Sequence, residues 1–470
     1  MKSSPDEVYD VNLERIAFGS CHSRGALIKS LNKSNTLHAD GSTVWDIIAS
    51  TVQPQAFLWS GDAIYPPKNI KGDTPLSVMQ NEYQQMMHNT TLGYAQFRQT
   101  KEPAVLGTWD DHDYGGNDRG RELTEREERR DAYLNFLDVP MDSPRWERKG
   151  VYSSIEFVGR GQDNNIVKVI FLDTRWHRER HCVPSVGSNP YVPYGALVAC
   201  LTRWITAGFD LPSILPNSWT SCTKNSEMLG EEQWTWLERQ LNDSKASMHI
   251  VISSIQVLTT NPVVESWGHF PNERERLLRL LNNITGLVIL SGDVHHAEIS
   301  TAIQTNQQVN AIENRMAVNK GTIVEVTSSG LTHSCSEPFY GPLCAPILNS
   351  FPTNRFVGGN VKDESLPSYY TKRNFGSIDI DWRSRSYNVN VHDSAGDVVL
   401  SAGFDMNAIA DMSNEDIRGV PACIDGHLKP YAKDVISFYL AGLLIFCLYY
   451  FYLRALEEGT NENAEKSKKD

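Results

Sequence analysis

Short apolar runs that end in an acidic or thiol side chain recur along this chain. They cover residues 14–20 before Cys21, 56–60 before Gly61-Asp62, 104–109 before Asp110, 166–172 before Asp173 and 287–291 before Gly292-Asp293. Runs of this length between polar segments are typical of buried strands. Ligands of open α/β sheets bind outside the carboxyl ends of the strands. We therefore expect these five side groups to converge on one site.

The densest of these strand ends is TWDDHDYGGND, over residues 108–118. It places four ionisable side chains, Asp110 to Asp113, directly after an apolar run and before a Gly-Gly turn. Burying such a group is costly unless a cation neutralises it. A solvated acidic turn is the alternative, and the recurrence of the pattern favours a metal centre.

The remaining pattern predicts an α/β fold. Helices are expected over residues 43–51, 77–100, 122–137, 229–242 and 271–282, with further strands over 249–254 and 321–328. Hairpins are expected at 151–157 with 166–173 and at 377–382 with 387–392. Periodicity is lost over residues 178–224, which predicts a long ordered insertion, a candidate lid over the site.

Charge and cysteine usage narrow the class of protein. The formal net charge is -13, and no basic stripe with interleaved aromatic residues is present, so a nucleic-acid partner is not expected. Protein partners are left open. Cys335 and Cys344 bracket a Pro/Gly-rich loop, and three further cysteines lie in the insertion (Cys182, Cys200, Cys222). This usage indicates disulfides in an oxidising compartment, with Cys21 left for the site.

An uncharged apolar run over residues 435–453 is long enough to span a bilayer. It predicts a globular domain over 1–406, a linker over 407–434, a transmembrane helix over 435–453 and a polar tail over 454–470. The expected protein is a single-pass membrane protein with a luminal or extracellular domain. Four N-x-S/T sequons (Asn32, Asn89, Asn242, Asn283) fit a glycoprotein. The N-terminus shows no signal peptide, so a tail-anchored cytosolic orientation stays open.

Six motifs in order carry a resemblance to a known family. They are FGSC (18–21), SGDAIY (60–65), WDDHD (109–113), LDTRWHR (172–178), ESWGHFPNERERLL (265–278) and LSGDVHHAE (290–298). As a set they resemble the PhoD-like alkaline phosphatases of the calcineurin-like metallophosphoesterase superfamily, across residues 16–327. The resemblance implies a four-layer α-β-β-α sandwich with mixed sheets.

The resemblance also implies roles for individual residues. Cys21, Asp62 and Tyr65 match ligands of a ferric ion, with Asp62 bridging to a second metal. Further expected metal ligands are Asp111, Asn117, Asp293 and His295. The family is associated with iron and calcium, while zinc, manganese and magnesium stay open. His112 is expected to contact the phosphate, and Arg175 either clamps a phosphoryl oxygen or forms an internal ion pair.

These roles predict attack of a metal-activated hydroxide on a phosphate monoester or diester, with His112 stabilising the leaving alkoxide. A phosphodiesterase of lipid head groups is an alternative within the same chemistry. From other classes, a catalytically silent binding protein of the same fold and redox use of an iron centre are the competing interpretations. The complete ligand set and the Asp111-His112 pair favour hydrolysis.

Overall fold

The computed structural model describes most of the chain. The described residues are 5–31, 42–67, 69–70, 72–99, 104–159, 165–180, 226–242, 244–303, 318–337 and 341–420, with isolated positions 198, 203, 434, 437, 440–442, 444–445 and 448–449. The predicted insertion lies almost entirely outside them, as do its three cysteines.

A six-stranded mixed sheet carries the N-terminal half of the site. Its order is β14-β13-β12-β2-β3-β4. Three neighbouring strands run parallel: β2 (Arg15–Gly19), β3 (Ala56–Ser60) and β4 (Ala104–Thr108). An antiparallel meander completes it: β12 (Asn374–Asp381), β13 (Ser386–Asp393) and β14 (Val398–Asp405). Gly19 pairs with Trp59 and Trp59 with Gly107, so the three parallel strands end side by side.

An eight-stranded mixed sheet carries the other half. Its strands are, in order, β1 (Glu7–Tyr9), β5 (Ser153–Val158), β6 (Ile166–Phe171), β7 (Met248–Ser253), β8 (Leu287–Ser291), β10 (Val324–Ser328), β9 (Ala297–Thr301) and β11 (Tyr369–Tyr370). The segment β6-β7-β8-β10 is parallel, so its carboxyl ends also meet at one edge. The predicted hairpin of residues 151–173 is present as antiparallel β5 and β6.

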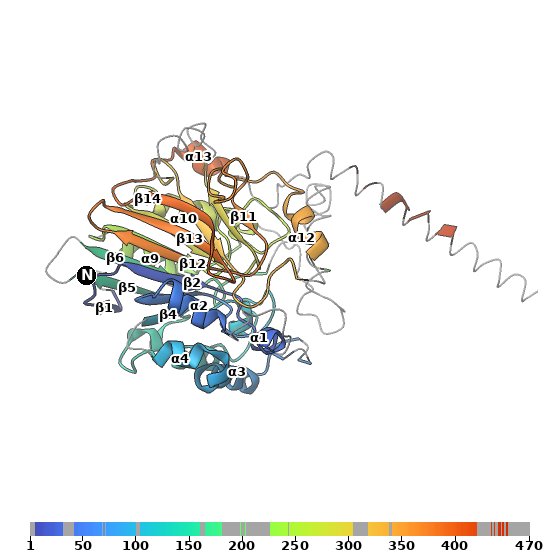
Figure 1. Cartoon of the computed structure of the whole chain (residues 1–470), viewed down its shortest axis with the longest axis horizontal. Coiled ribbons are helices and arrows are strands. Elements are labelled where there is room, and N and C mark those ends of the chain that lie inside the picture. The colour runs from blue at the N-terminus through green and yellow to red at the C-terminus, as the bar shows by residue number, and fades with distance from the viewer. Residues whose placement is uncertain are drawn as a thin grey trace, which may run out of the picture.

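The two sheets pack face to face, and helices cover their outer faces (Figure 1). Apolar side chains of both sheets form the central core, for example Phe18 and Leu58 against Ile250 and Leu290. The helices over the larger sheet are α9 (Glu231–Asn242), α10 (Pro271–Leu281) and α13 (Asn414–Gly419). Those over the smaller sheet are α2 (Val44–Thr51), α3 (Leu76–His88), α4 (Tyr94–Gln99) and α6 (Arg126–Phe136).

Local sequence explains these helices. A capping box between Thr43 and Asp46 begins α2, which then buries Trp45 and Ile48. The predicted helix over 77–100 is interrupted at the 3-10 turn η1 (Thr90–Leu92), where Asn89 caps the turn. Short helices not predicted from the sequence are α1 (Arg24–Leu31), α5 (Asp111–Tyr114), α12 (Gly341–Leu348) and the 3-10 turns η2 (Pro144–Glu147) and η3 (Trp267–His269).

The transmembrane helix predicted over residues 435–453 is corrected by the structure. Among the described residues, no helix has the length and apolar character needed to cross a bilayer. The longest described helix, α3, has 13 residues, whereas a span requires about 20 apolar ones. The predictions of a single-pass membrane protein and of a membrane partner are corrected with it.

Part of the predicted linker is packed onto the domain. Ala410, Met412 and the helix α13 contribute to the core cluster beneath α10. Asn282 binds the backbone of Met412 in both directions, at 3.0 and 3.1 Å. Residues 408–420 therefore belong structurally to the outer layer of the larger sheet.

Candidate metal centre

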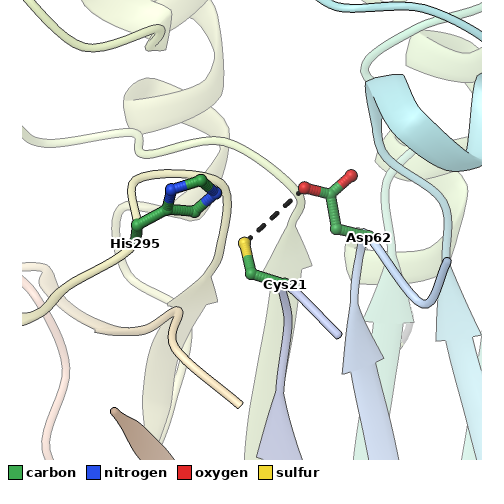
Figure 2. Close-up of side chains that lie close together, drawn as sticks. All are labelled: Cys21, Asp62 and His295. Atoms are coloured by element: carbon green, nitrogen blue, oxygen red, sulfur yellow. Dashed lines mark hydrogen bonds between the residues drawn. The ribbon is translucent and has the colours of Figure 1, made fainter. Parts of the chain in front are cut away.

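The candidate site lies where the carboxyl ends of β2, β3 and β4 face those of β8 and β10. Cys21 and Asp62 follow β2 and β3, whereas His295 follows β8 in the other sheet. Figure 2 shows the thiol of Cys21 pointing at the Asp62 carboxylate, with the His295 ring beside it. Strands from both sheets thus bring together side chains that are up to 274 residues apart in the sequence.

Four of the predicted ligands adopt left-handed backbone conformations. The φ angles are 62° at Cys21, 54° at Asp62, 70° at Asp293 and 57° at His295. L-residues rarely adopt these angles, and such backbones cluster at functional sites, where the surrounding structure enforces them. Here each angle turns a side chain sharply off the end of its strand, toward the space between the sheets.

The glycine before Asp62 has no room for a side chain. Gly61 has φ +98°, and a Cβ there would lie 2.5 Å from Cβ of Asp110. Gly292 is equally confined, since its Cβ would lie 2.4 Å from the backbone oxygen of Ser60. Both Gly-Asp pairs therefore let neighbouring strand ends approach closely, as their sequence pattern predicts.

Asp62 presents its two carboxylate oxygens to different groups. Oδ2 accepts a 2.5 Å hydrogen bond from the hydroxyl of Tyr65 and lies 3.6 Å from Sγ of Cys21. Oδ1 accepts from the backbone N–H of His112 at 3.3 Å. The Tyr65 hydroxyl also lies 3.1 Å from Nε2 of His295. One side of the carboxylate therefore faces Cys21, Tyr65 and His295, and the other faces α5.

Three overlapping groups of side chains could each hold a metal ion, and Asp62 belongs to all of them. Within each group the ligand atoms lie within 4.8 Å of one another. The groups are Cys21, Asp62 and His295; Asp62, Asp111 and His112; and Asp62, Asp110, Asp111 and Asp293. Carboxylate, imidazole and thiolate donors in this arrangement fit one or more metal ions.

The buried carboxylates of the site also favour the binding of cations. Burial, followed by the neighbouring anionic groups, raises the pKa values of Asp62 and Asp293 well above the usual range. Burial raises the pKa of Asp110 to about 8, although Arg175 opposes the shift. Oδ1 of Asp111 is buried and has no hydrogen-bond partner among the described residues. When several buried carboxylates lie this close together, they are stable as anions only if positive charge lies beside them.

Arg175, predicted as a phosphate contact or an ion-pair partner, is fully buried beside the site. Its guanidinium donates from Nε to Asp110 at 2.6 Å and from Nη1 and Nη2 to Glu265 at 2.8 and 3.0 Å. The internal ion pair is therefore present, with Asp110 and Glu265 as partners. Contact with a phosphoryl oxygen stays a prediction.

Asp173 does not join the other strand-end carboxylates. Its Oδ1 accepts hydrogen bonds from the backbone N–H groups of Arg175 and Trp176, at 2.8 and 2.9 Å, and its Oδ2 accepts from Val151 at 2.9 Å. Through these three hydrogen bonds, the Asp173 carboxylate stabilises the turn after β6. The expectation that Asp173 would reach the site is therefore wrong.

His112 is at the edge of the cluster, and Asn117 follows it in the chain. The His112 ring is half-buried, 4.0 Å from that of Tyr65 between centroids, and burial lowers the pKa of this imidazole. Asn117 is in the turn after α5, next to Asp118, whose backbone N–H donates to Oδ2 of Asp111 at 2.7 Å. Asn117 is thus near the cluster in the chain, and its role as a ligand stays a prediction.

Several residues at the site were not singled out from the sequence. Asp118 and Glu265 form a further metal-capable group with Asp111. Ser329 Oγ lies 3.0 Å from Sγ of Cys21, and the His333 ring lies 4.4 Å from that of His295. Asp118 and Glu265 lie within quoted motifs, so a signal for them existed. Ser329 and His333 follow β10 in an unremarkable Ser/Gly segment, so no pattern pointed to them.

The comparisons with known proteins agree with this geometry. The family model described as "PhoD-like phosphatase" matches residues 33–391. Alkaline phosphatase D of Bacillus subtilis (strain 168) is 32% identical over 90 residues, a match that spans 17% of this chain and 15% of that relative.

Two solved structures resemble the chain. "Structure of PhoD" matches with a TM-score of 0.46 and 14% identity, over 90% of this chain and 78% of that one. A 5'-nucleotidase precursor from Thermus thermophilus has a TM-score of 0.29 and 11% identity, over 92% of this chain and 59% of that one. The family model spans well over half of the chain, which therefore belongs to the PhoD-like phosphatase family.

Proposed function

We propose that this chain hydrolyses phosphate monoesters, diesters or both at a centre that holds two metal ions. The observation that carries the proposal is the position of Asp62, with one oxygen toward Cys21 and Tyr65 and the other toward α5. A carboxylate that faces two ligand groups suits the bridging position of a two-metal hydrolase. The family is metal-dependent, which supports the same chemistry.

The donor set suggests how two ions divide the ligands. Cys21, Tyr65 and His295 lie on the Oδ2 side of Asp62. Thiolate and phenolate donors suit ferric iron, the ion implied by the family resemblance. The second side offers Asp111 and Asp293, whose oxygen donors suit calcium. Asn117 is proposed as a further oxygen donor from the family resemblance alone. Bound ions would supply Lewis-acid activation of water and neutralise charge on the phosphoryl group.

The chain's own groups then orient the substrate and handle its leaving group. Because burial lowers the pKa of His112, its imidazole is neutral, and it can stabilise the leaving oxygen through an N–H hydrogen bond. Arg175 holds Asp110 and Glu265 in place. A direct contact between Arg175 and phosphate requires one of these pairs to open.

The test is metal content and ester hydrolysis of the purified full chain. Metals are counted by elemental mass spectrometry, and hydrolysis is followed with p-nitrophenyl phosphate and bis(p-nitrophenyl) phosphate. Asp62→Asn is compared with Asp411→Asn, which changes an exposed carboxylate. We expect about two ions per chain in the wild type and in Asp411→Asn, and a loss of activity in Asp62→Asn of at least about a hundredfold.

The outcomes separate the alternatives. Wild-type protein with bound metals that cleaves neither ester would contradict hydrolysis of simple phosphate esters and favour a binding role. Full metal content and activity in Asp62→Asn would contradict the bridging role. If the purified chain holds only iron, or zinc in both positions, the proposed identity of the ions would change. The proposed site would stand.

A further inference from the structure

The loop that follows β10, residues 329–335, is attached to ligands from both sheets. Ser329 Oγ accepts from the backbone N–H of His295 at 3.0 Å and lies 3.0 Å from Sγ of Cys21. Thr332 Oγ1 lies 3.3 Å from the backbone oxygen of Cys21. The Cys335 N–H donates to the backbone oxygen of His295 at 2.8 Å. The loop is therefore held in a fixed position over the candidate metal centre.

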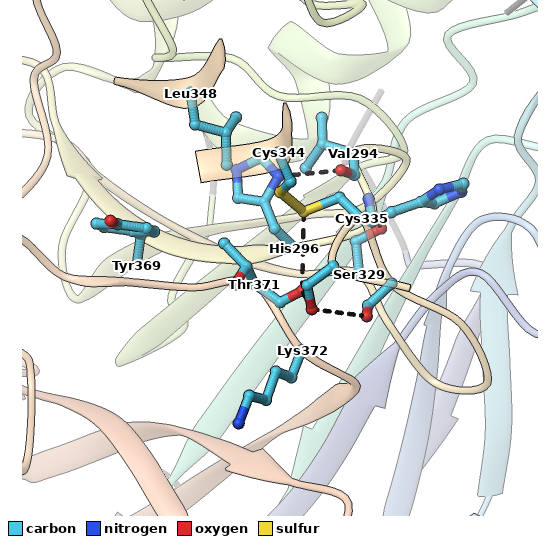
Figure 3. Close-up of a disulfide and its surroundings, with 12 residues drawn as sticks. Val294, His296, Ser329, Cys335, Cys344, Leu348, Tyr369, Thr371 and Lys372 are labelled. Atoms are coloured by element: carbon cyan, nitrogen blue, oxygen red, sulfur yellow. Dashed lines mark hydrogen bonds between the residues drawn. A yellow bond between two sulfur atoms is a disulfide. The ribbon is translucent and has the colours of Figure 1, made fainter. Parts of the chain in front are cut away.

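A disulfide and a neighbouring strand fix the far end of this loop. Cys335 is bonded to Cys344 of α12, a pairing that the sequence left open, and Figure 3 shows the bridge beside Thr371. Ser336 donates to the backbone oxygen of Thr371 at 2.7 Å. A loop restrained at both ends loses little further entropy when one of its side chains binds a ligand.

His333 projects from the middle of this loop onto two proposed ligands. Its ring centroid lies 4.4 Å from that of His295 and 4.8 Å from that of Tyr65. None of the metal-capable groups found among the described residues includes His333. The residue is half-buried. His333 thus lies beside the proposed ligands His295 and Tyr65 and outside the proposed ligand set.

The polar contacts of His333 leave one ring nitrogen available. Nδ1 lies 3.3 Å from Oγ1 of Thr332, which fixes one edge of the imidazole. Nε2 forms no hydrogen bond with any described residue. The His333 ring meets Tyr65 edge-on, at 88° between ring planes, and His112 contacts the same tyrosine at a tilt of 34°. Both histidines therefore contact Tyr65, whose hydroxyl donates to Asp62.

We propose that His333 positions the substrate by a hydrogen bond from its imidazole to a non-bridging oxygen of the phosphate group. The phosphate is the part of any ester substrate that must lie over the metal centre, and His333 borders that centre beside the ligands His295 and Tyr65. The proposal deepens the proposed hydrolysis and rests on it. According to this proposal, His333 binds the phosphate group equally well in the ground state and in the transition state.

The test separates KM from kcat. Because the hydrogen bond is made in both states, His333→Ala is expected to raise KM for p-nitrophenyl phosphate about tenfold and to leave kcat within about threefold. The affinity for inorganic phosphate, measured by calorimetry on the metal-loaded protein, should fall by the same factor. His333→Gln retains an N–H donor and should recover part of both losses. His88→Ala, at an exposed histidine of α3, is the matched control and should change neither quantity.

Two results with His333→Ala would overturn the proposal, and two with the wild type bear on the hydrolysis it rests on. Loss of metal in His333→Ala at an unchanged melting temperature would make His333 a ligand. Unchanged phosphate affinity in that variant would exclude a phosphate contact. A wild type that binds phosphate but cleaves no ester would contradict the proposed hydrolysis, and the calorimetric comparison would still decide the role of His333. A wild type that binds no phosphate would overturn both.

Discussion

The thiol of Cys21 and the hydroxyl of Ser329 lie 3.0 Å apart, although 308 residues separate them in the chain. Ser329 Oγ also accepts the backbone N–H of His295, and its own proton can be donated to the sulfur when Cys21 is a thiolate. Burial raises the pKa of Cys21, and the hydrogen bond from Ser329 opposes that increase. One hydroxyl therefore supports the anionic form of one proposed ligand and fixes the backbone of another.

This relationship predicts the effect of Ser329→Ala. The variant leaves the N–H of His295 without its partner and removes a donor from the sulfur. We expect the free energy of unfolding to fall by about 1–3 kcal/mol and the metal ions to dissociate about tenfold faster. Urea denaturation and release of metal to a chelator would measure the two effects. Ser77→Ala, at an exposed position of α3, should change neither. Equal dissociation rates in all three proteins would contradict a supporting role for Ser329.

Arg175 tests whether the buried ion pairs are structural. Its side chain is fully buried against Asp110 and Glu265, so Arg175→Met leaves Asp110 without its cation and Glu265 with Arg178 alone. We expect a loss of about 3–5 kcal/mol in the free energy of unfolding. Arg239→Met, on the exposed face of α9, should stay within about 0.5 kcal/mol of the wild type. A variant of Arg175 with normal stability and a raised KM would instead establish the phosphate contact predicted from the sequence.

His249 predicts a pH dependence of stability away from the site. Its Nδ1 and Nε2 lie 2.8 Å from the Thr285 carbonyl and the Ser244 hydroxyl, and burial lowers its pKa from 6.5 to about 4. Between these values the unfolded chain binds the proton and the folded chain does not. The contribution of His249 to the free energy of unfolding is therefore fully present above pH 6.5. It decreases toward pH 4, by up to roughly 3 kcal/mol.

The matched variant is His249→Gln, which does not titrate. Urea denaturation of both proteins at pH 7 and pH 4.5 isolates the contribution of this histidine from that of other titrating groups. The wild type should lose more stability than the variant on acidification, by about 2–3 kcal/mol. Parallel losses in the two proteins would contradict the assignment of a depressed pKa to His249.

The disulfide between Cys335 and Cys344 should retain the metal ions. Cys335 donates its N–H to the backbone of His295, so loosening the loop loosens a proposed ligand. We expect Cys344→Ser to lose about 2–3 kcal/mol of stability and to release metal faster than the wild type. Mild reduction of the wild type should reproduce this release, whereas reduction of Cys344→Ser should add nothing. Metal retention that is insensitive to both changes would separate the disulfide from the centre.

Local pattern predicted most of the strands and several residues that the structure brings into the candidate metal centre. The strand over residues 56–60 and the helix over 271–282 were read from apolar runs and periodicity, and both are present. Asp62 and Asp293 were predicted from a Gly-Asp pair at a strand end. The structure brings both into metal-capable groups. The reason is that each of these glycines lets two strand ends approach closely. The acid that follows each glycine then lies near the end of the neighbouring strand.

The errors arise where distant segments decide the outcome. Asp173 ends a strand as Asp62 does, but the backbone N–H groups of its own turn and of Val151 bind its carboxylate. A local difference was present, since Gly61 precedes Asp62 whereas Leu172 precedes Asp173. Ser329 matters only because β10 ends beside Cys21, a tertiary relationship. The apolar run over 435–453 met the length criterion for a membrane span, but none of the helices in the described part of the chain is long and apolar enough to cross a membrane.

The position of β2 in its sheet has a consequence for biosynthesis. This strand, which leads into Cys21, lies between β3 and β12, so its second edge stays unpaired until residues 374–381 have been synthesised. The loop that carries Ser329 is also made more than 300 residues after Cys21. A ribosome-bound chain therefore cannot present the assembled set of donors during most of its elongation. Metal insertion belongs to the end of synthesis, and the ions available where the finished chain folds determine which of them it acquires.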